Sequence, residues 1–387
     1  MQNVKALPVD PGFFPGVARQ SELPEKYESI LQFLEQQNVD ALLLMRHENI
    51  AWSTAGIVEM RVAIPGETAV GWLLFTRAGE RYYLTTENEA PRLAAEEFQH
   101  LDFQPIVRPW YDEDWMPAVR KIIGARTIVS DHASSGLPVV SLQPLRLVLS
   151  SGEIDRYRWL GLHTAEATAE VLLRLRPGMT EADMQAQIAE ALLARRILPT
   201  VFLMGTDQRI LKYRHAVPRG GVLEKFGMLN LCARRWGLAV SITRYIHFGK
   251  MPEDLRKKFR AAAYVYSGLL QATRPGATSD ALFQVAQAAY VEAGFPGDEQ
   301  LHHQGGATGY GEREWLARPG GKEVVANAQA FAWNPSVQGG KIEDTVLLLP
   351  HSDESDPIET LTATPTLPTE KTELAGTVYR TPAVLEV

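Results

Sequence analysis

The sequence is poor in several features that mark particular classes of protein. It has one cysteine, Cys232, in 387 residues, so no disulfide can form within the chain, which fits a reducing compartment. Its formal net charge of -7 opposes a general nucleic-acid surface, because phosphate binding draws on clustered Lys and Arg. No apolar run approaches the roughly 20 residues that span a bilayer, and residues 1–16 lack a basic-then-apolar signal pattern. We therefore expect a cytoplasmic protein with neither nucleic acid nor membrane as a partner.

The composition is that of a globular protein, and the length allows two domains. The chain is 45% hydrophobic and 22% charged, and its length is comfortable for two domains. In residues 1–150, short apolar runs such as 40–45 alternate with helical patterns, and Arg77-Ala-Gly-Glu80 reads as the turn of a hairpin. Residues 1–20, with three prolines, are expected to be loop. These patterns predict an α/β domain over residues 1–150.

An internal repeat organises the rest of the chain. Arg176-Pro-Gly-Met-Thr180 recurs as Arg274-Pro-Gly-Ala-Thr278, and each copy has a helical pattern before and after it. A common helix-to-helix connector would explain the motif alone, but the matching flanks favour duplication. Residues 151–387 are therefore predicted to contain two related halves around a pseudo-twofold axis, with a cleft between them. From Pro350 the chain is rich in Thr and Pro, and residues 351–387 are expected to form an extended tail on the surface.

A thirteen-residue stretch from His302 to Glu314 concentrates groups that bind and protonate small polar molecules. It contains two imidazoles, four glycines and then Glu312-Arg313-Glu314. Glycine lets a backbone pass close to a ligand, and imidazole, guanidinium and carboxylate orient and protonate polar substrates. We expect this stretch to line a functional site.

The order of these segments resembles the pita-bread family, which includes creatinase, prolidase, aminopeptidase P and methionine aminopeptidase. The resemblance rests on the two Pro-Gly-x-Thr halves, Ser241-Ile-Thr-Arg244, the His-rich glycine loop and, most specifically, Gly339-Gly-Lys-Ile-Glu-Asp-Thr345. It covers residues 152–365, and Asn49-Ile-Ala-Trp52 resembles the first domain of the creatinase and prolidase branch. It implies an α/β (α+β) chain with a creatinase-like domain over residues 1–150, a pita-bread domain over 151–387, and a homodimer.

The same resemblance argues against the family's metal chemistry. Peptidases of the family hold two divalent metals with two Asp, one His and two Glu. Here the matching places hold Asn230, Ser241, Gly306 and Asn334, and only Glu343 remains. Because a pair of divalent ions needs several anionic oxygens, we expect no metal and no other cofactor. A single ion at the adjacent His302 and His303 is not favoured, since two neighbouring histidines without Cys are a weak metal signature.

His215 matches the histidine that works on water and substrate in creatinase. The expected catalytic residues are His215, Glu343 and Glu314. The expected substrate-binding residues are His302, His303, Tyr310, Arg313, Arg244, Ser241, Asn230, Asn334 and Arg61. Within an extended segment, only one of the two adjacent histidines would face the cleft.

Each of these assignments has a simpler alternative. His215 could be a loop histidine bonded to backbone, and Glu343 could form a buried salt bridge with Arg244 or Arg313. Arg313 and Glu314 could form a solvated turn. Ser241 lacks a Gly-x-Ser-x-Gly elbow, so a pocket hydroxyl is favoured over a nucleophile.

Three further residues carry open alternatives. A small core thiol is the default for Cys232, and Trp333 either walls the pocket or belongs to the core. An Arg from the partner's first domain reaches the site in creatinase. Arg61 is preferred over Arg46 for that role.

The leading functional hypothesis is a metal-independent hydrolase of creatinase type. It would act on a C–N bond of a small polar substrate with a carboxylate and an amino or guanidino group, and elimination or isomerisation would need the same groups. The alternative is a non-catalytic binding or interaction protein on a degenerate peptidase fold. A metal-dependent Xaa-Pro peptidase is the third hypothesis.

Overall fold

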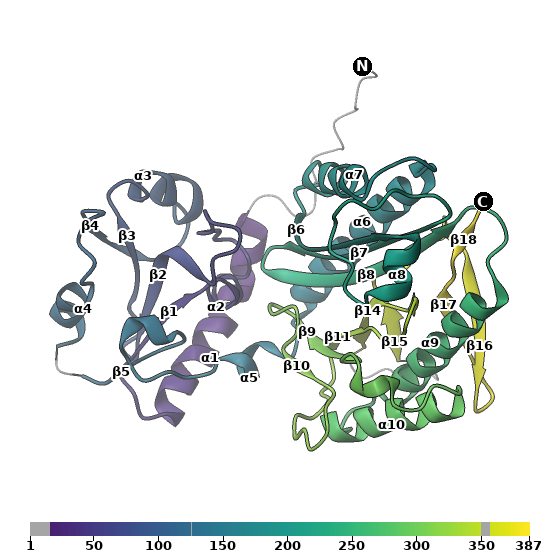
Figure 1. Cartoon of the computed structure of the whole chain (residues 1–387). Helices are drawn as coiled ribbons and strands as arrows, with labels where there is room; N and C mark the ends of the chain where they lie inside the picture. Colours follow the sequence, from purple (N-terminus) through teal and green to yellow (C-terminus); the bar gives the residue numbers. More distant parts are fainter. Residues whose placement is uncertain (1–15, 125, 350–356) are drawn as a thin grey trace. The chain divides into compact units, whose positions relative to one another are not determined.

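The computed structural model describes residues 16–124, 126–349 and 357–387, which form two compact units (Figure 1). The first unit runs to Arg146 and includes Trp236–Leu238, and the second contains Leu147–Arg235 and Ala239–Val387. The loop expected over residues 1–20 lies largely outside the described residues. Among the helices of the described part, none is long and apolar enough to cross a membrane.

The first unit is built on a five-stranded mixed sheet in the order β4-β3-β2-β1-β5. β1 is buried on both faces, as expected of a Leu-rich central strand, and the predicted hairpin joins β2 and β3 in antiparallel pairing. Its strands are Ala41–Arg46 (β1), Thr68–Thr76 (β2), Arg81–Thr86 (β3), Gln104–Arg108 (β4) and Ile128–Ser130 (β5). Its helices and helical turns are Gly16–Glu22 (η1), Leu23–Gln36 (α1), His47–Ser53 (α2), Ala90–Arg92 (α3), Leu93–Glu97 (η2), Met116–Ile123 (α4), Ala133–Ser135 (η3) and Gln143–Arg146 (α5).

The second unit contains two larger sheets, with strand orders β18-β8-β7-β6 and β10-β9-β11-β14-β15. The first of these sheets uses Leu198–Thr206 (β6), Phe226–Arg235 (β7), Leu238–His247 (β8) and Leu385–Glu386 (β18). The second uses Gly305–Thr308 (β9), Trp315–Leu316 (β10), Gln329–Trp333 (β11), Asp344–Leu348 (β14) and Ile358–Thr360 (β15). Two ribbons pair Ser336–Val337 (β12) with Gly340–Lys341 (β13) and Thr369–Leu374 (β16) with Thr377–Pro382 (β17).

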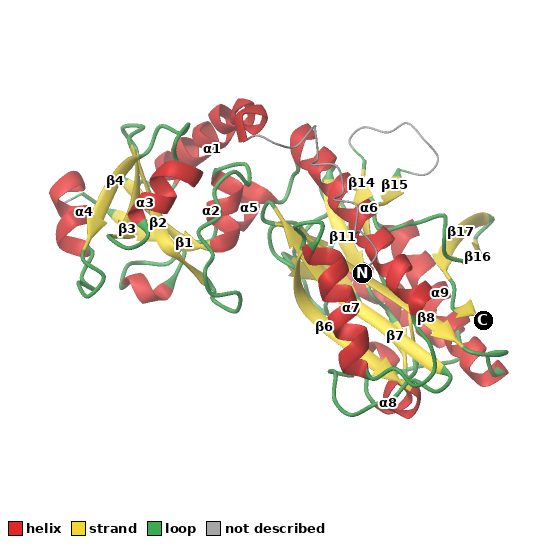
Figure 2. Cartoon of the chain, turned by 90° about the horizontal axis from the view of Figure 1, so that it is seen from above, coloured by secondary structure: helices red, strands yellow, loops and turns green. Residues whose placement is uncertain are grey.

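The helices α6, α7 and α9 pack against these strands (Figure 2). α6 and α7 contact each other and the strands β7 and β6, whereas α9 and α10 contact each other, and α9 lies against β13. A capping box between Ser150 and Glu153 begins α6. The helices are Ser151–Arg174 (α6), Glu181–Leu193 (α7), Asp207–Lys212 (α8), Glu253–Ala272 (α9), Ser279–Glu292 (α10) and Asp298–Gln300 (η4).

The predicted internal repeat is confirmed in the local geometry of its two copies. Gly178 and Gly276 both take left-handed backbone angles, with φ of 94° and 90°, where glycine carries no steric cost. Thr180 and Thr278 then cap α7 and α10 through their side chains. Each threonine also makes an isolated antiparallel bridge to a valine, Val222 in one half and Val324 in the other. The same sequence therefore builds the same helix–turn–helix corner twice.

The end of the chain is more regular than the extended tail that the sequence predicted. Within residues 357–387, β15 pairs with β14, β16 and β17 form a ribbon, and β18 runs parallel to β8. Trp333 belongs to the core, where its ring stacks on Phe331 and its Nε1 donates to Thr273. This assigns Trp333 to the core and not to a pocket wall.

Candidate functional site

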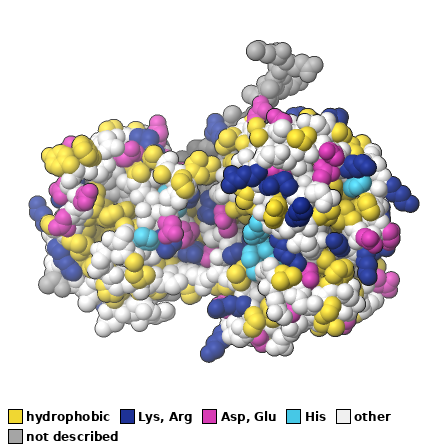
Figure 3. Space-filling model, viewed as in Figure 1, with side chains coloured by type: hydrophobic (Ala, Val, Ile, Leu, Met, Phe, Trp, Pro, Cys, Tyr) yellow, Lys and Arg dark blue, Asp and Glu magenta, His cyan; other side chains and the backbone are white. Residues whose placement is uncertain are grey.

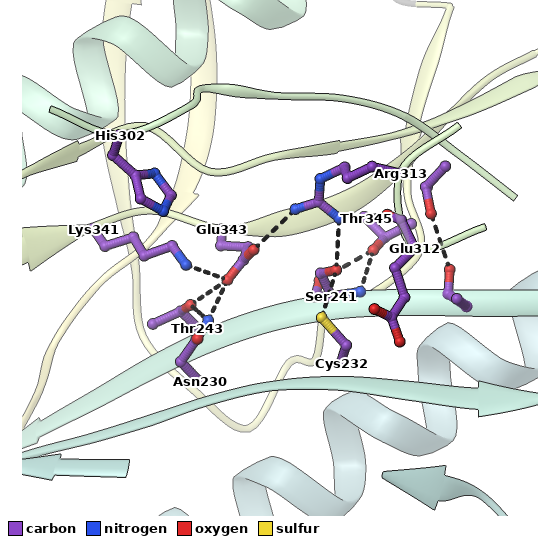
Figure 4. A network of polar contacts seen from close by, with 12 residues as sticks. Asn230, Cys232, Ser241, Thr243, His302, Glu312, Arg313, Lys341, Glu343 and Thr345 are labelled. Atoms are coloured by element: carbon purple, nitrogen blue, oxygen red, sulfur yellow. Dashed lines mark hydrogen bonds and ion pairs between the residues drawn. The ribbon is translucent and has the colours of Figure 1, made fainter. Parts of the chain in front are cut away.

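Strands β7 and β8 present alternating polar side chains to one place in the second unit (Figure 4). Asn230 and Cys232 lie two residues apart on β7, and Ser241 and Thr243 lie two residues apart on β8. Because side chains alternate along a strand, each pair shares one face. Asn230 and Thr243 bind the carboxylate of Glu343, which lies between β13 and β14, and Arg313 links Ser241 to the same carboxylate.

Glu343 is buried, with an exposed fraction of 2%, and several groups bind its carboxylate. Lys341 Nζ lies 2.8 Å from Oε2, and Arg313 Nη2 lies 3.4 Å from Oε1. Thr243 Oγ1 donates to Oε2 at 2.5 Å, and the Asn230 amide nitrogen donates to the same oxygen. Burial raises the pKa of Glu343, but the charges of Lys341 and Arg313 outweigh it and lower the pKa to about 2. The carboxylate is therefore ionised and already neutralised by the chain's own cations.

Ser241 belongs to the same network, on the other side of Arg313. Arg313 Nη1 donates to Ser241 Oγ at 3.0 Å, and Cys232 Sγ lies 3.2 Å from the same oxygen. Burial, together with the negative charge of Glu343, raises the pKa of the Cys232 thiol to about 11. Cys232 is therefore a protonated, weakly reactive thiol at neutral pH.

A cluster of three imidazoles lies close to this network. The Nε2 atoms of His215 and His302 are 2.9 Å apart, and the ring of His302 stacks on that of His303 with centroids 4.4 Å apart. A hydrogen bond between two ring nitrogens needs one N–H and one bare nitrogen, which two neutral rings supply. The stacking places both rings on the same side of the chain, which bends at His302 and is not the extended segment that the sequence analysis assumed. That only one of the two histidines faces the cleft remains a prediction. Figure 3 shows a group of histidine side chains at the surface.

The surroundings keep these imidazoles neutral. Burial, followed by the positive charge of Lys341, lowers the pKa of His302 to about 3. The same two causes lower the pKa of His215, which is closer to solvent. A neutral imidazole is the form that accepts a proton, so His215 has the protonation state of a general base at neutral pH.

The depressed pKa of His302 predicts a loss of stability in acid. Unfolded histidine has a pKa near 6.5, so between pH 6.5 and about 3 the unfolded chain binds a proton at His302 that the folded chain does not. Stability is therefore complete above pH 6.5 and falls as the pH is lowered through this window. We expect the urea midpoint to fall less steeply with acidification in His302→Gln than in wild type or in the control His163→Gln. Parallel curves for all three proteins would contradict the assignment.

A small cavity adjoins His302 and Lys341. Its volume is about 20 Å³, which is room for a single water or a similarly small group. Its polar lining includes His302, Lys341, Arg214 and Ser336, and the remainder consists of Ile210, Tyr213, Met228, Tyr245, Val337, Gly339 and Gly340.

The donor set does not fit a pair of divalent ions. No group of three or more His, Cys, Asp or Glu side chains is placed to hold a metal within residues 16–124, 126–349 and 357–387. Asn230 and Ser241 are neutral, and a Cβ atom at Gly306 would lie 2.0 Å from the carbonyl oxygen of Trp315. Asn334 is buried, and its Oδ1 has no hydrogen-bond partner among the described residues. One carboxylate with two protein cations against it cannot replace the anionic oxygens that such ions require.

Two predicted substrate-binding residues are engaged elsewhere. Arg244 is buried, and its guanidinium pairs with Asp344 at 2.7 Å and donates to the carbonyl oxygen of Thr362. The hydroxyl of Tyr310, also buried, donates to Glu153 at 2.6 Å. Both side chains use these polar groups in contacts within the fold, and their substrate-binding roles remain predictions.

Two other predicted residues are placed without a test of their role. The Glu314 carboxylate accepts a hydrogen bond of 2.8 Å from the backbone N–H of Gly311 and so stabilises its own loop. Arg61 lies in the first unit, where Nη1 donates to the carbonyl oxygen of Ile64. The catalytic role of Glu314 and the partner-site role of Arg61 remain predictions.

Sequence reasoning missed Lys341 and Thr243. Lys341 stands two residues before Glu343 in the most specific motif, and residues at that spacing share a face of an extended segment. The same spacing pairs Thr243 with Ser241 on β8. Strand periodicity, applied within the motifs, would have found both.

Two related halves, each a helix pair joined to a strand hairpin, define a pita-bread fold, a fold of peptidases and related hydrolases. A family model for metallopeptidase family M24 matches residues 156–349. The chain belongs to this family.

Similar proteins carry peptidase names. The probable dipeptidase PepE of Mycobacterium tuberculosis (strain ATCC 25618 / H37Rv) is 27% identical over 228 residues, which are 55% of this chain and 60% of that protein. The match thus spans less than two thirds of that relative. The Xaa-Pro dipeptidase from Bacillus anthracis has a TM-score of 0.72 at 16% identity, covering 94% of this chain and 100% of that one. The X-Pro aminopeptidase from Thermotoga maritima MSB8 has a TM-score of 0.69 at 18% identity. That match covers 93% of this chain and 99% of the other. At these identities the solved structures establish the fold alone.

Proposed function

We propose that this protein is a metal-independent hydrolase that cleaves a C–N bond in a small polar substrate bearing a carboxylate. The observation that carries the proposal is the neutral His215–His302 pair beside a carboxylate, Glu343, whose charge Lys341 and Arg313 already balance. The pair provides a base, and the fixed cations provide the positive field. A homodimer and a cytoplasmic location belong to the same proposal.

The chemistry needs one proton acceptor and one stabilised oxygen. His215 takes a proton from water while the water oxygen bonds to the substrate's carbonyl carbon, and the carbonyl electron pair moves onto its oxygen. When the C–N bond breaks, the leaving nitrogen takes the proton back from His215. With Lys341 and Arg313 against Glu343, the three charges sum to +1, which favours an anionic substrate.

The names of similar proteins suggest where a search for substrates should begin. One relative is called a probable dipeptidase and one structural neighbour an Xaa-Pro dipeptidase. A dipeptide has both an amide C–N bond and a free carboxylate. Dipeptides and guanidino or ureido carboxylates therefore form the first panel to assay.

His215→Ala is expected to lower turnover at least about 100-fold, the size of a lost general base. Wild-type turnover is expected to persist in EDTA. The assay measures release of amine from the panel, with His163→Ala on α6 as a control that should keep wild-type rates. Turnover that survives in His215→Ala, or that EDTA abolishes and manganese, zinc or cobalt restores, would contradict the proposal.

The size of the cavity favours a second candidate, a binding protein without chemistry. The space of about 20 Å³ beside His302 and Lys341 holds little more than a water. Under this candidate the purified protein would carry a bound metabolite or retain a protein partner and show no turnover with the panel. Native mass spectrometry of the purified protein, set beside the amine-release assay, separates the two candidates.

A further inference from the structure

Lys341 has hydrogen-bonding capacity that its known contact does not use. Its side chain is 8% exposed, and Nζ lies 2.8 Å from Glu343 Oε2. Within the described residues, Glu343 is the one group that contacts this ammonium at hydrogen-bonding or ion-pairing distance. An ammonium carries three N–H donors, and leaving buried donors unsatisfied is costly.

The spare donors lie next to an accessible space. Lys341 and His302 both line the cavity of about 20 Å³, and they lie near one another in Figure 4. His302 Nδ1 is a second buried polar atom with no hydrogen-bond partner among the described residues. A small oxygen-bearing group in the cavity would accept hydrogen bonds from the spare donors of Lys341.

The backbone fixes Lys341 in this position. It lies in the short ribbon β12–β13, where Ser336 is its partner across the pair. A Cβ atom at the preceding Gly340 would lie 3.2 Å from the backbone nitrogen of Phe259, so the ribbon passes tightly against α9. A donor held by such a scaffold needs little reorganisation to bind a developing charge, which is what makes electrostatic stabilisation effective.

We propose that Lys341 is a catalytic residue, whose ammonium, fixed by Glu343, donates to the carbonyl oxygen of the substrate in the cavity beside His302. This inference rests on the hydrolase proposed above. In the attack step, a bond forms between water oxygen and the carbonyl carbon, and His215 takes the water's proton. The carbonyl π pair moves to oxygen, where the Lys341 N–H groups hold it. When that pair re-forms the C=O bond, the C–N bond breaks and the nitrogen leaves with the proton from His215.

The first test measures binding of an oxygen anion and does not depend on turnover. Sodium formate is titrated into the full-length protein and followed by saturation-transfer NMR. We expect wild type and His215→Ala to bind it and Lys341→Met to bind at least tenfold more weakly. Lys258→Met, at a lysine that lines a different cavity, serves as the matched control and should bind as wild type does. Equal binding by wild type and Lys341→Met, or no binding by wild type, overturns the contact.

A second variant guards against a folding defect. Lys341→Met leaves Glu343 without its nearest cation, so Lys341→Met/Glu343→Gln, in which both charges are gone, is measured beside it after circular dichroism confirms folding. The double variant is also expected to bind formate at least tenfold more weakly than wild type. Wild-type affinity in the folded double variant overturns the proposal.

The second test uses any substrate that the panel reveals. Lys341→Met is expected to lower kcat about 100-fold or more, as when one oxyanion donor is removed, with a change in KM below about threefold. If His215→Ala abolishes turnover and Lys341→Met does not lower kcat, the hydrolase stands and the role of Lys341 fails. If no substrate of the panel turns over, the hydrolase fails, and the assignment of Lys341 as catalytic fails with it even where formate binds.

Discussion

Gly306→Ala is expected to lower the free energy of unfolding by about 3 kcal/mol, at the upper end of the cost of overpacking. The new Cβ would lie 2.0 Å from the carbonyl oxygen of Trp315 and 2.8 Å from the Cα of Leu316. Gly306 pairs with Leu316 between β9 and β10, so the new Cβ would clash with backbone atoms. A backbone cannot relieve a clash by changing rotamer, as a side chain can. Urea unfolding at neutral pH measures the difference.

Gly220→Ala is the matched control, because a Cβ there meets no atom within 4 Å. Its effect should stay within about 0.5 kcal/mol, as for other surface substitutions. Equal stability of the two variants would show that the backbone of β10 can shift to make room for a Cβ atom at residue 306.

The result bears on the metal site of the family. In the motif match predicted from the sequence, the family's ligand His falls on Gly306, and a histidine carries the same Cβ that alanine does. If alanine is not tolerated, substitution of side chains alone cannot rebuild the ligand set. The backbone of β10 would then exclude a ligand side chain at this position, which would support the proposed metal independence.

The parts of the fold that sequence could predict are those set by local chemistry. Thr180 and Thr278 are helix caps, Gly178 and Gly276 take left-handed angles, and Ser150 begins α6. Each follows from the residue and its immediate neighbours. The recurrence of one such corner at both positions was enough to predict two related halves.

Several members of the network around Glu343 were predicted from the sequence, although Lys341 and Thr243 were missed, but its pairings were not predictable. Alternation along the chain required Glu343 and Asp344 to face opposite ways, but it could not say which arginine would meet which carboxylate. The structure pairs Arg313 with Glu343 and Arg244 with Asp344. That choice depends on how β8 and β14 lie in space, which no local pattern encodes.

Two other features could not be predicted from the sequence for the same reason. The stacking of His302 on His303 needs a bend in the chain, and the glycines that permit it do not specify it. The strands after residue 357 form because distant partners, β14 and β8, are there to pair with. Their Thr- and Pro-rich sequence alone signals no sheet.

Arg244→Met is expected to destabilise the protein by about 3 to 5 kcal/mol, the cost of breaking a buried ion pair by removing one partner. Arg244 and Asp344 each have side chains only 4% exposed and lie 2.7 Å apart. Arg244 Nη1 also donates to the carbonyl oxygen of Thr243 at 2.8 Å, and Nη2 to that of Thr362 at 2.8 Å. The substitution would leave Asp344 buried without its cation, with only the Thr362 hydroxyl still donating to it, and would remove the arginine donors from both carbonyls.

Urea unfolding with two companion variants separates a structural arginine from a substrate-binding one. Arg244→Met/Asp344→Leu removes both charges and should recover part of the loss, because the uncompensated carboxylate is gone. Arg158→Met breaks the exposed pair with Glu359 and should cost less than about 1 kcal/mol. An arginine that bound substrate would give the opposite pattern, a stable Arg244→Met protein with a raised KM and no recovery in the double variant. That pattern would support a substrate-binding role for Arg244.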